Sequence, residues 1–461
     1  MNEPLRNTTR HWKALEQRHH LAPFTDYKAL GAGGGPRIIV KAEGCWLEDS
    51  EGHRILDGMA GLWNVNIGYG NRQLAQAAYE QMLQLPYYNT FFKTAHPPVA
   101  ELSEKLAEIA PAGLERAFYG SSGSEANDTM VRLVKRYWNL MGQPEKKIII
   151  SREWAYHGST MAAASLGGMT SMHQMSDLPL PGFLHVMPPY QHHFGRPGES
   201  AEDFGLRAAK ALEDKILELG PERVGAFVAE PIQGAGGVII PPESYWPEIQ
   251  RICRQYDLLL VADEVICGFG RTGEWFACQT LDIKPDLMPT AKGITSGYLP
   301  LSALMVGERV SEALREKGGE FYHGYTYDGH PVACAVALAN IRYIEAEGLV
   351  ERVREDVGPY ILKAFGEALD GHPLVTGVRA KGLVGAVELK VPDGVAPRSD
   401  EAGKTGGRVR DLMTEQGLVM RAVYDTMVFS PPLIITREEI DQMVERAKAA
   451  IDQAAREAGL L

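Results

Sequence analysis

Short apolar runs alternate with longer amphipathic stretches along the chain, most clearly between residues 110 and 310. An apolar run of four to six residues is typical of a buried strand, whereas apolar residues that recur every three or four positions predict a helix. In Glu125–Trp138, for example, Ala126, Met130 and Val134 fall on one helical face. The strands predicted in this region are Ala117–Tyr119, Lys147–Ser151, Leu184–Met187, Val224–Ala229, Leu258–Asp263, Asp286–Ala291 and Ser302–Val306.

Strands that alternate with helices predict an α/β fold, in which helices flank a mostly parallel sheet. The two ends of the chain have a different pattern. Residues 45–57 read as a hairpin, and two long helical patterns beyond Pro331 precede a strand at Leu383–Leu389 and a final helix from Arg437. We therefore predict one large domain, and one small α+β domain built from both chain ends. The predicted boundaries are 1–65 and 331–461 for the small domain and 66–330 for the large one.

Composition narrows the possible classes of protein. The chain has 461 residues, 45% of them apolar and 23% charged, as in an ordinary globular protein. Its 47 basic and 59 acidic residues leave a net charge of −12, which disfavours nucleic acid as a partner. The five cysteines include no CxxC pair, and no segment resembles a signal peptide or a membrane span. We expect a cytoplasmic protein with no membrane or nucleic-acid partner.

A carboxylate stands at the end of one predicted strand. Asp263 and Glu264 follow directly on the apolar run Leu258–Ala262. Ligands of open α/β sheets bind at the carboxyl ends of the strands. A carboxylate in this place is either an exposed helix cap or a group that meets a cation or hydrogen-bond donors, because burying it alone is costly.

A lysine stands at the end of the next strand. Lys292 follows Asp286–Ala291, and the residues after it are small or polar rather than charged. Taken alone, such a lysine is most often a surface residue. A lysine that is desolvated in a pocket, however, can form a Schiff base. Together with Asp263, Lys292 suggests pyridoxal phosphate, because the lysine would hold the aldehyde and the carboxylate would keep the pyridine nitrogen protonated.

That cofactor also needs a phosphate site. Gly120–Ser124 (GSSGS) joins a strand to the amphipathic helix described above. Free backbone N–H groups at a helix start, with the helix dipole and serine hydroxyls, make an anion site. A simple serine helix cap with Glu125 in the first turn explains the same residues equally well.

Other chemistries have weaker signals. Gly268–Gly273 (GFGRTG) matches the G-x-G-x-x-G pattern of dinucleotide-binding proteins, but two carboxylates precede it and no helix is evident directly after it. No HExxH or G-x-S-x-G motif is present, so we propose no metal and no serine nucleophile.

Several segments, in order over nearly the whole chain, resemble the class III (ω-) aminotransferases, which are pyridoxal-phosphate enzymes of fold type I. They are YGSSGSEAND (119–128), YHGST (156–160), AEPIQGAGG (229–237), VADEVICGFGRTG (261–273), DLMPTAKGITSGYLPLSA (286–303) and HGYTYDGHP (323–331). HHLAPFTDYK, MAGLWNVNIGYG and GLVMRAVYDTMVFSPPL resemble the amine–pyruvate and putrescine (polyamine)–pyruvate enzymes of that family.

The resemblance implies roles for individual residues. Lys292 would carry the cofactor and move the proton, and Asp263 would pair with the pyridine nitrogen. Gly123 and Ser124 would bind the phosphate, together with Thr326 from a partner subunit of a homodimer or tetramer. The remaining implied residues are Val265 and Tyr156 on the two ring faces, Trp63, Phe91 and Tyr156 as an aromatic wall of the substrate pocket, and Arg421 for the carboxylate of the keto acid.

Two positions depart from the family pattern. Ala235 stands where the ornithine and γ-aminobutyrate branches have a glutamate that pairs with the arginine corresponding to Arg421. This leaves Arg421 free to bind pyruvate and to move aside for an amine without a carboxylate. Asp328 stands where relatives have serine; we expect a solvent-facing turn residue there, the alternative being a contact with the distal ammonium of a diamine.

The resemblance thus implies transfer of an amino group from a primary amine, such as putrescine or a polyamine, to pyruvate, giving an aldehyde and L-alanine in a ping-pong reaction. Three alternatives stay open at this point. They are an ω-amino acid–pyruvate aminotransferase, an aminomutase or racemase on the same fold, and a nicotinamide oxidoreductase that uses Gly268–Gly273.

Overall fold

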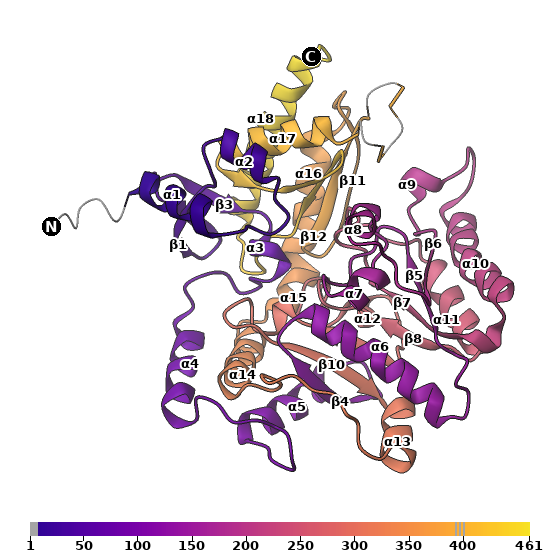
Figure 1. Cartoon of the computed structure of the whole chain (residues 1–461). Helices are drawn as coiled ribbons and strands as arrows, with labels where there is room; N and C mark the ends of the chain where they lie inside the picture. The colour runs from indigo at the N-terminus through magenta and orange to yellow at the C-terminus, as the bar shows by residue number, and fades with distance from the viewer. Residues whose placement is uncertain (1–7, 392–393, 396–397, 400–401) are drawn as a thin grey trace.

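A seven-stranded sheet forms the centre of the computed structural model, which describes residues 8–391, 394–395, 398–399 and 402–461 (Figure 1). The strand order is β4-β10-β9-β8-β7-β5-β6, and β10 runs antiparallel to both of its neighbours. The predicted α/β fold is confirmed, and each predicted strand overlaps an observed one. The strands are β4 (Leu114–Gly120), β5 (Ile148–Arg152), β6 (Phe183–Val186), β7 (Val224–Ala229), β8 (Leu259–Ala262), β9 (Leu287–Thr290) and β10 (Ser302–Gly307).

Both faces of this sheet are buried, which explains why its strands are continuously apolar. In β7, Ala226 and Val228 point to one face and join a core cluster with α6 (Gly123–Leu140). Phe227 and Ala229 point to the other face and join the cluster that contains α10 (Ala201–Leu219) and α11 (Tyr245–Gln255). In Figure 1, α6 crosses in front of the sheet.

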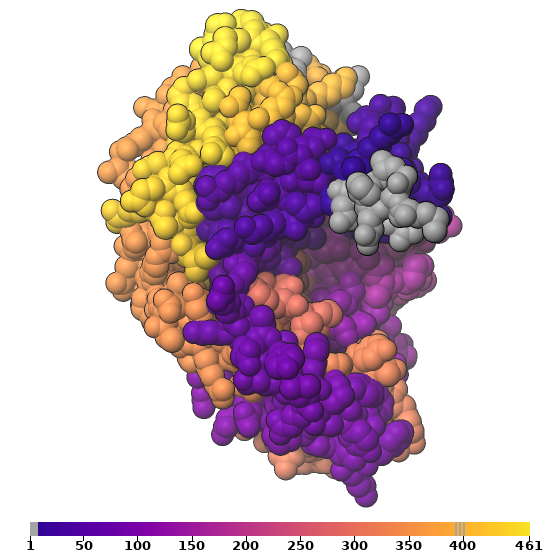
Figure 2. Space-filling view, turned by 90° about the vertical axis from the view of Figure 1, so that its left-hand side faces the viewer, coloured from indigo at the N-terminus to yellow at the C-terminus, as the bar shows by residue number. Residues whose placement is uncertain are grey.

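Two smaller sheets are built from the chain ends. The first combines β1 (Ile39–Glu43), β2 (Trp46–Asp49) and β3 (Arg54–Asp57) with β13 (Leu418–Val419). The second contains β11 (Val375–Lys381), β12 (Val384–Leu389), β14 (Arg421–Val423) and β15 (Thr426–Phe429), all antiparallel. Leu56 of β3 lies opposite Leu418 of β13, and Figure 2 shows the indigo N-terminal segment against the yellow C-terminal one. The exact domain boundaries stay a prediction.

The predicted hairpin, the strand at Leu383–Leu389 and the final helix are all observed. The final helix, α18 (Arg437–Glu457), begins at Arg437 because Thr436 and Glu439 form a reciprocal capping box. No helix of the described residues has the length and apolar character needed to cross a membrane. The other helices are α1 (Thr9–His19), α2 (Tyr27–Ala32), α3 (Ala60–Trp63), α4 (Arg72–Gln84), α5 (Pro97–Ile109), α7 (Met161–Leu166), α8 (Thr170–Met175), α9 (Gln191–Phe194), α12 (Ala277–Thr280), α13 (Glu308–Lys317), α14 (Pro331–Ala346), α15 (Leu349–Arg352), α16 (Gly358–Leu369) and α17 (Lys404–Glu415).

Candidate active site

Three parallel strands end at one cavity of about 400 Å³. Ala229 of β7 pairs with Ala262 of β8, and β8 pairs in turn with β9. The residues that follow these strands, Glu230, Asp263 and Lys292, therefore emerge at the same edge of the sheet, and all three line the cavity. Of the predicted site residues, six line it: Gly123, Ser124, Tyr156, Asp263, Val265 and Lys292.

Lys292 has an unusual backbone and an unusual amine. Its φ is +46°, in the left-handed region, which costs a non-glycine residue about 1 kcal/mol. Such strain is typical of functional positions. Burial lowers the pKa of the Lys292 amine, while the carboxylates of Asp263 and Glu230 oppose this shift. A lowered pKa favours the neutral amine, which has the lone pair needed for nucleophilic attack.

Asp263 is held by residues to which the sequence analysis gave no role. Its Oδ2 lies 2.7 Å from His157 Nδ1 and accepts a hydrogen bond of 2.9 Å from Asn127 Nδ2. Its Oδ1 accepts a hydrogen bond of 3.0 Å from the backbone N–H of Val265. Because an ionised carboxylate only accepts, His157 Nδ1 carries the hydrogen. The carboxylate is buried yet well satisfied, and it is oriented for a cationic partner.

The start of α6 has the features of an anion site. The Ser122 side chain caps this 18-residue helix by accepting from Glu125 N, and Ser121 to Ser124 line the cavity. Ser124 Oγ accepts a hydrogen bond of 3.0 Å from Ser159 N, so its hydroxyl hydrogen is left for a ligand. The helix dipole adds attraction for negative charge.

This set of groups fits pyridoxal phosphate. The cavity presents an amine, a buried carboxylate for a pyridinium and a helix start for a phosphate. Glycines keep its wall open: a Cβ on Gly123 would lie 3.1 Å from the Val265 methyls, and one on Gly158 would lie 2.5 Å from Ser124 Oγ. Side chains at these positions would fill the space that the cofactor needs.

Three predicted substrate residues lie beside the cavity without lining it. Trp63 is buried next to Asn64, which does line it. The Arg421 guanidinium carbon lies 5.2 Å from the Trp63 ring centroid, and burial lowers its pKa. Ala235 is buried in the loop after β7. Within the described part of the chain, no carboxylate pairs with Arg421.

Phe91 and Thr326 lie elsewhere. Thr326 is exposed, and its carbonyl accepts a hydrogen bond of 2.6 Å from Tyr87 Oη. The Phe91 ring lies so close to Gly324 that a Cβ there would be 2.7 Å from it. The structure therefore groups these two residues with each other, outside the cavity of their own chain.

The prediction that Asp328 faces solvent is wrong. Its exposed fraction is 7%, its Oδ2 accepts a hydrogen bond of 2.8 Å from Tyr325 N, and its Oδ1 has no partner. Burial and the nearby Glu125 raise the pKa of the Asp328 carboxyl to about 7. The segment folds back on itself and covers the side chain, which the turn-like sequence does not reveal.

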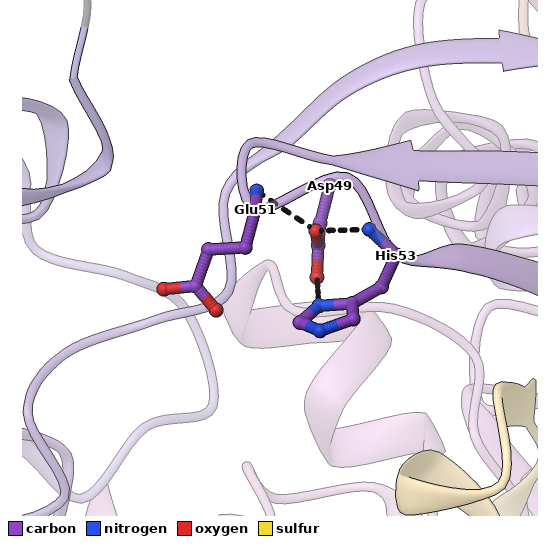
Figure 3. Close-up of side chains that lie close together, drawn as sticks. All are labelled: Asp49, Glu51 and His53. Atoms are coloured by element: carbon purple, nitrogen blue, oxygen red, sulfur yellow. Dashed lines mark hydrogen bonds and ion pairs between the residues drawn. The ribbon is translucent and has the colours of Figure 1, made fainter.

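A cluster of potential metal ligands is explained as a turn. Asp49 Oδ1 accepts hydrogen bonds of 2.9 Å from the backbone N–H groups of Glu51 and His53, and His53 Nδ1 lies 2.9 Å from Oδ2 (Figure 3). Arg37 lies 3.6 Å from the same carboxylate. Because these donors already occupy Asp49, the cluster stabilises the β2–β3 hairpin.

Glu230 could have been found from the sequence, but His157 and Asn127 could not. Glu230 follows the apolar run Val224–Ala229 in the same way that Asp263 follows its own strand. His157 and Asn127 come from separate segments, and only the fold brings them to Asp263.

Comparisons with known proteins agree with this geometry. The model of the family "Aminotransferase class-III" matches residues 29–451. A putrescine–pyruvate aminotransferase of Pseudomonas aeruginosa is 52% identical over 457 residues, 99% of either chain, and a diaminobutyrate–2-oxoglutarate transaminase of Halomonas elongata is 42% identical over 94% of this chain and 93% of its own length. The solved omega transaminase of Pseudomonas jessenii, in complex with PMP, is 42% identical, covers 97% of this chain and 99% of its own, and superposes with a TM-score of 0.94. This chain belongs to the class III aminotransferases and is a transaminase that uses pyridoxal phosphate.

Proposed function

We propose that the enzyme transfers the amino group of a diamine such as putrescine, or of a related polyamine, to pyruvate. The observation that carries the transfer chemistry is the joint placement of the Lys292 amine and the Asp263 carboxylate in one cavity. The similarity to the putrescine–pyruvate aminotransferase supports the choice of substrates.

The residues of the cavity would have separate roles in cofactor binding and proton transfer. Bound pyridoxal phosphate supplies a ring that withdraws electrons from the carbon bearing the amino group. Lys292 would hold the cofactor and, as a neutral amine, take the proton from that carbon. Asp263 would pair with the ring nitrogen, Val265 and Tyr156 would contact the two ring faces, and the start of α6 would hold the phosphate.

Arg421 would bind the acceptor. Its guanidinium lies against Trp63 and close enough to Lys292 to influence its pKa, and the described residues offer it no carboxylate partner. A planar fork suits the carboxylate of a keto acid. Ala235, being small, leaves this arginine unpaired, and we infer that Arg421 moves aside when a carboxylate-free amine binds.

We also propose that two copies form one functional unit. Thr326 and Phe91 would complete the site of the partner subunit, as neither reaches the cavity of its own chain. Exposed apolar residues lie near them in the chain: Leu83, Phe92 and Tyr327 are exposed by 71%, 90% and 60%. Tyr327 contacts Tyr87 and Phe92 contacts Phe91, with ring centroids 6.0 and 5.8 Å apart, and exposed apolar side chains of this kind mark interaction surfaces. The five unpaired, buried cysteines further support a reducing, cytoplasmic location.

A panel of amine donors with pyruvate as the common acceptor tests the substrate proposal. Putrescine, cadaverine, spermidine, β-alanine and an aryl-alkyl amine are compared by the rate of L-alanine formation. We expect the highest kcat/KM for a diamine or polyamine. A clear preference for β-alanine would establish the ω-amino acid alternative instead, and turnover without any keto acid would indicate an aminomutase.

A further inference from the structure

The loop that follows β7 connects the cavity to the small sheet of the C-terminal segment. At its start, Glu230 lines the cavity, where its Oε1 accepts from Tyr156 N at 3.3 Å. Its Oε2 accepts a hydrogen bond of 2.8 Å from Gly234 N, further along the same loop. Ala235 follows directly. The position of this loop therefore determines where Ala235 lies.

Arginines of the C-terminal segment hold the other side of this loop. Arg379 of β11 donates from Nε to the carbonyl of Val238 at 2.6 Å and from Nη2 to that of Gly237. Arg398 donates to the carbonyl of Gly236. Three successive carbonyls of the loop thus accept hydrogen bonds from two guanidinium groups.

Arg379 is itself fixed by a buried carboxylate. Its Nη1 pairs with Glu388 Oε1 of β12, which also accepts from Tyr190 Oη. Glu388 Oε2 accepts a hydrogen bond of 2.8 Å from Thr426 Oγ1. The Glu388 side chain is 6% exposed and that of Arg379 is 20% exposed. A largely buried ion pair contributes little net stability compared with apolar residues of the same size. We therefore infer that this pair serves to orient the Arg379 guanidinium.

We propose that Arg379, oriented by Glu388, is a positioning residue that sets the loop 234–238 and thereby the keto-acid pocket beside Arg421. The inference rests on the proposed function. Val238 packs in one apolar cluster with Trp63, the residue under the Arg421 guanidinium. A displaced loop would change the room available to the acceptor carboxylate, whereas Lys292, in the turn after β9, would keep its place. Loss of Arg379 therefore affects acceptor binding more than proton transfer.

The Arg379→Lys variant tests this role, because lysine keeps the charge and loses the planar fork. We expect KM for pyruvate to rise about tenfold while kcat falls by less than about threefold. In the holoenzyme, the backbone amides of residues 233–239 should exchange with deuterium faster than in the wild type. The control is Arg410→Lys, at an exposed arginine of α17 that pairs with Asp411. This variant should leave KM for pyruvate, kcat and amide exchange unchanged.

A Glu388→Gln variant provides the second measurement, and we expect a smaller change in the same direction. The proposal would be overturned if kcat fell while KM for pyruvate stayed unchanged. It would also be overturned if the amides of residues 233–239 exchanged at the wild-type rate. If neither variant folds, Arg379 is only structural and the proposal also fails. Amide exchange needs no turnover, and wild-type turnover of pyruvate is measured separately, so failure of the proposed substrates is distinguished from failure of this inference.

Discussion

At the scale of single residues, hydrogen bonding decides what the two central groups can do. Asp263 is buried but accepts from His157, Asn127 and the backbone of Val265. These donors fix the direction of the carboxylate, so that it can pair with a protonated ring nitrogen. Lys292 has the opposite environment, because burial disfavours its charged form. The site thus holds a stabilised carboxylate and a readily deprotonated amine in one cavity.

Replacement of His157 by alanine should weaken this arrangement. The variant removes a hydrogen bond to a charged group, worth about 1.5–3 kcal/mol, so kcat/KM should fall about 10- to 100-fold. Release of pyridoxal phosphate on dialysis should also be faster, which visible absorbance measures. The matched control is His372→Ala, which removes a histidine 3.1 Å from Asp452, away from the cavity. If His157→Ala and His372→Ala lose the same activity, the predicted role of His157 is wrong.

Asp328 should make stability depend on pH. Its carboxyl has a pKa of about 7 in the fold, against an ordinary value of 3.8. The folded state therefore holds a proton that the unfolded state releases, so stability falls as pH rises from about 4 to 7. Asp328→Asn should therefore stabilise the fold more at pH 8 than at pH 5, which a comparison of Tm values at the two pH values measures. The gain in free energy of unfolding at pH 8 should be at most about 4 kcal/mol. Because Asp328 is buried and does not line the cavity, the preference for putrescine over a monoamine should stay the same; a changed preference would support the diamine contact.

At the scale of elements, the start of α6 and the segment after β5 approach each other so closely that only glycine fits. Gly158 has φ +138°, and a Cβ there would lie 2.5 Å from Ser124 Oγ and 2.8 Å from the Ala163 Cβ. The approach brings Ser159 N to Ser124 Oγ and so fixes the hydroxyl at the proposed phosphate site.

The Gly158→Ala variant should therefore lose affinity for the cofactor. Backbone strain and the clash with Ser124 together cost about 1–3 kcal/mol, so the Kd for pyridoxal phosphate should rise at least about tenfold. Fluorescence titration of the apoenzyme measures this. Gly366→Ala in α16 is the control: a Cβ there meets nothing within 4 Å, and we expect unchanged affinity and equal or higher stability. Unchanged affinity in Gly158→Ala would contradict the predicted crowding.

At the scale of the whole molecule, segments far apart in the sequence contact each other in two places. The N-terminal hairpin pairs with β13, and the C-terminal Arg379 binds the loop after β7. Thr326 and Phe91, by contrast, lie outside the cavity of their own chain, near the exposed aromatic residues Phe92 and Tyr327. A second copy of the chain is the partner that would bring these two residues to a cavity.

Mixing inactive subunits tests the shared site. Lys292→Ala should be inactive because it lacks the amine, and Thr326→Trp should be inactive because it blocks the partner's phosphate site. Refolded together in equal amounts, half of the dimers would be mixed and carry one intact site, so activity should return to about a quarter of the wild-type value. Size-exclusion chromatography with light scattering confirms the assembly. No recovery from verified mixed dimers would show that each chain supplies its own site.

The sequence by itself determined the layers of this protein and the identity of its two central groups. Apolar strands and amphipathic helices can be recognised from the pattern of neighbouring residues alone. Asp263 and Lys292 stand directly after two such strands, and a parallel sheet brings the residues at its carboxyl ends to the same edge. Only the tertiary structure decided what surrounds these groups. His157, Asn127, Arg379 and the burial of Asp328 depend on contacts between residues far apart in sequence, and no local pattern encodes such contacts.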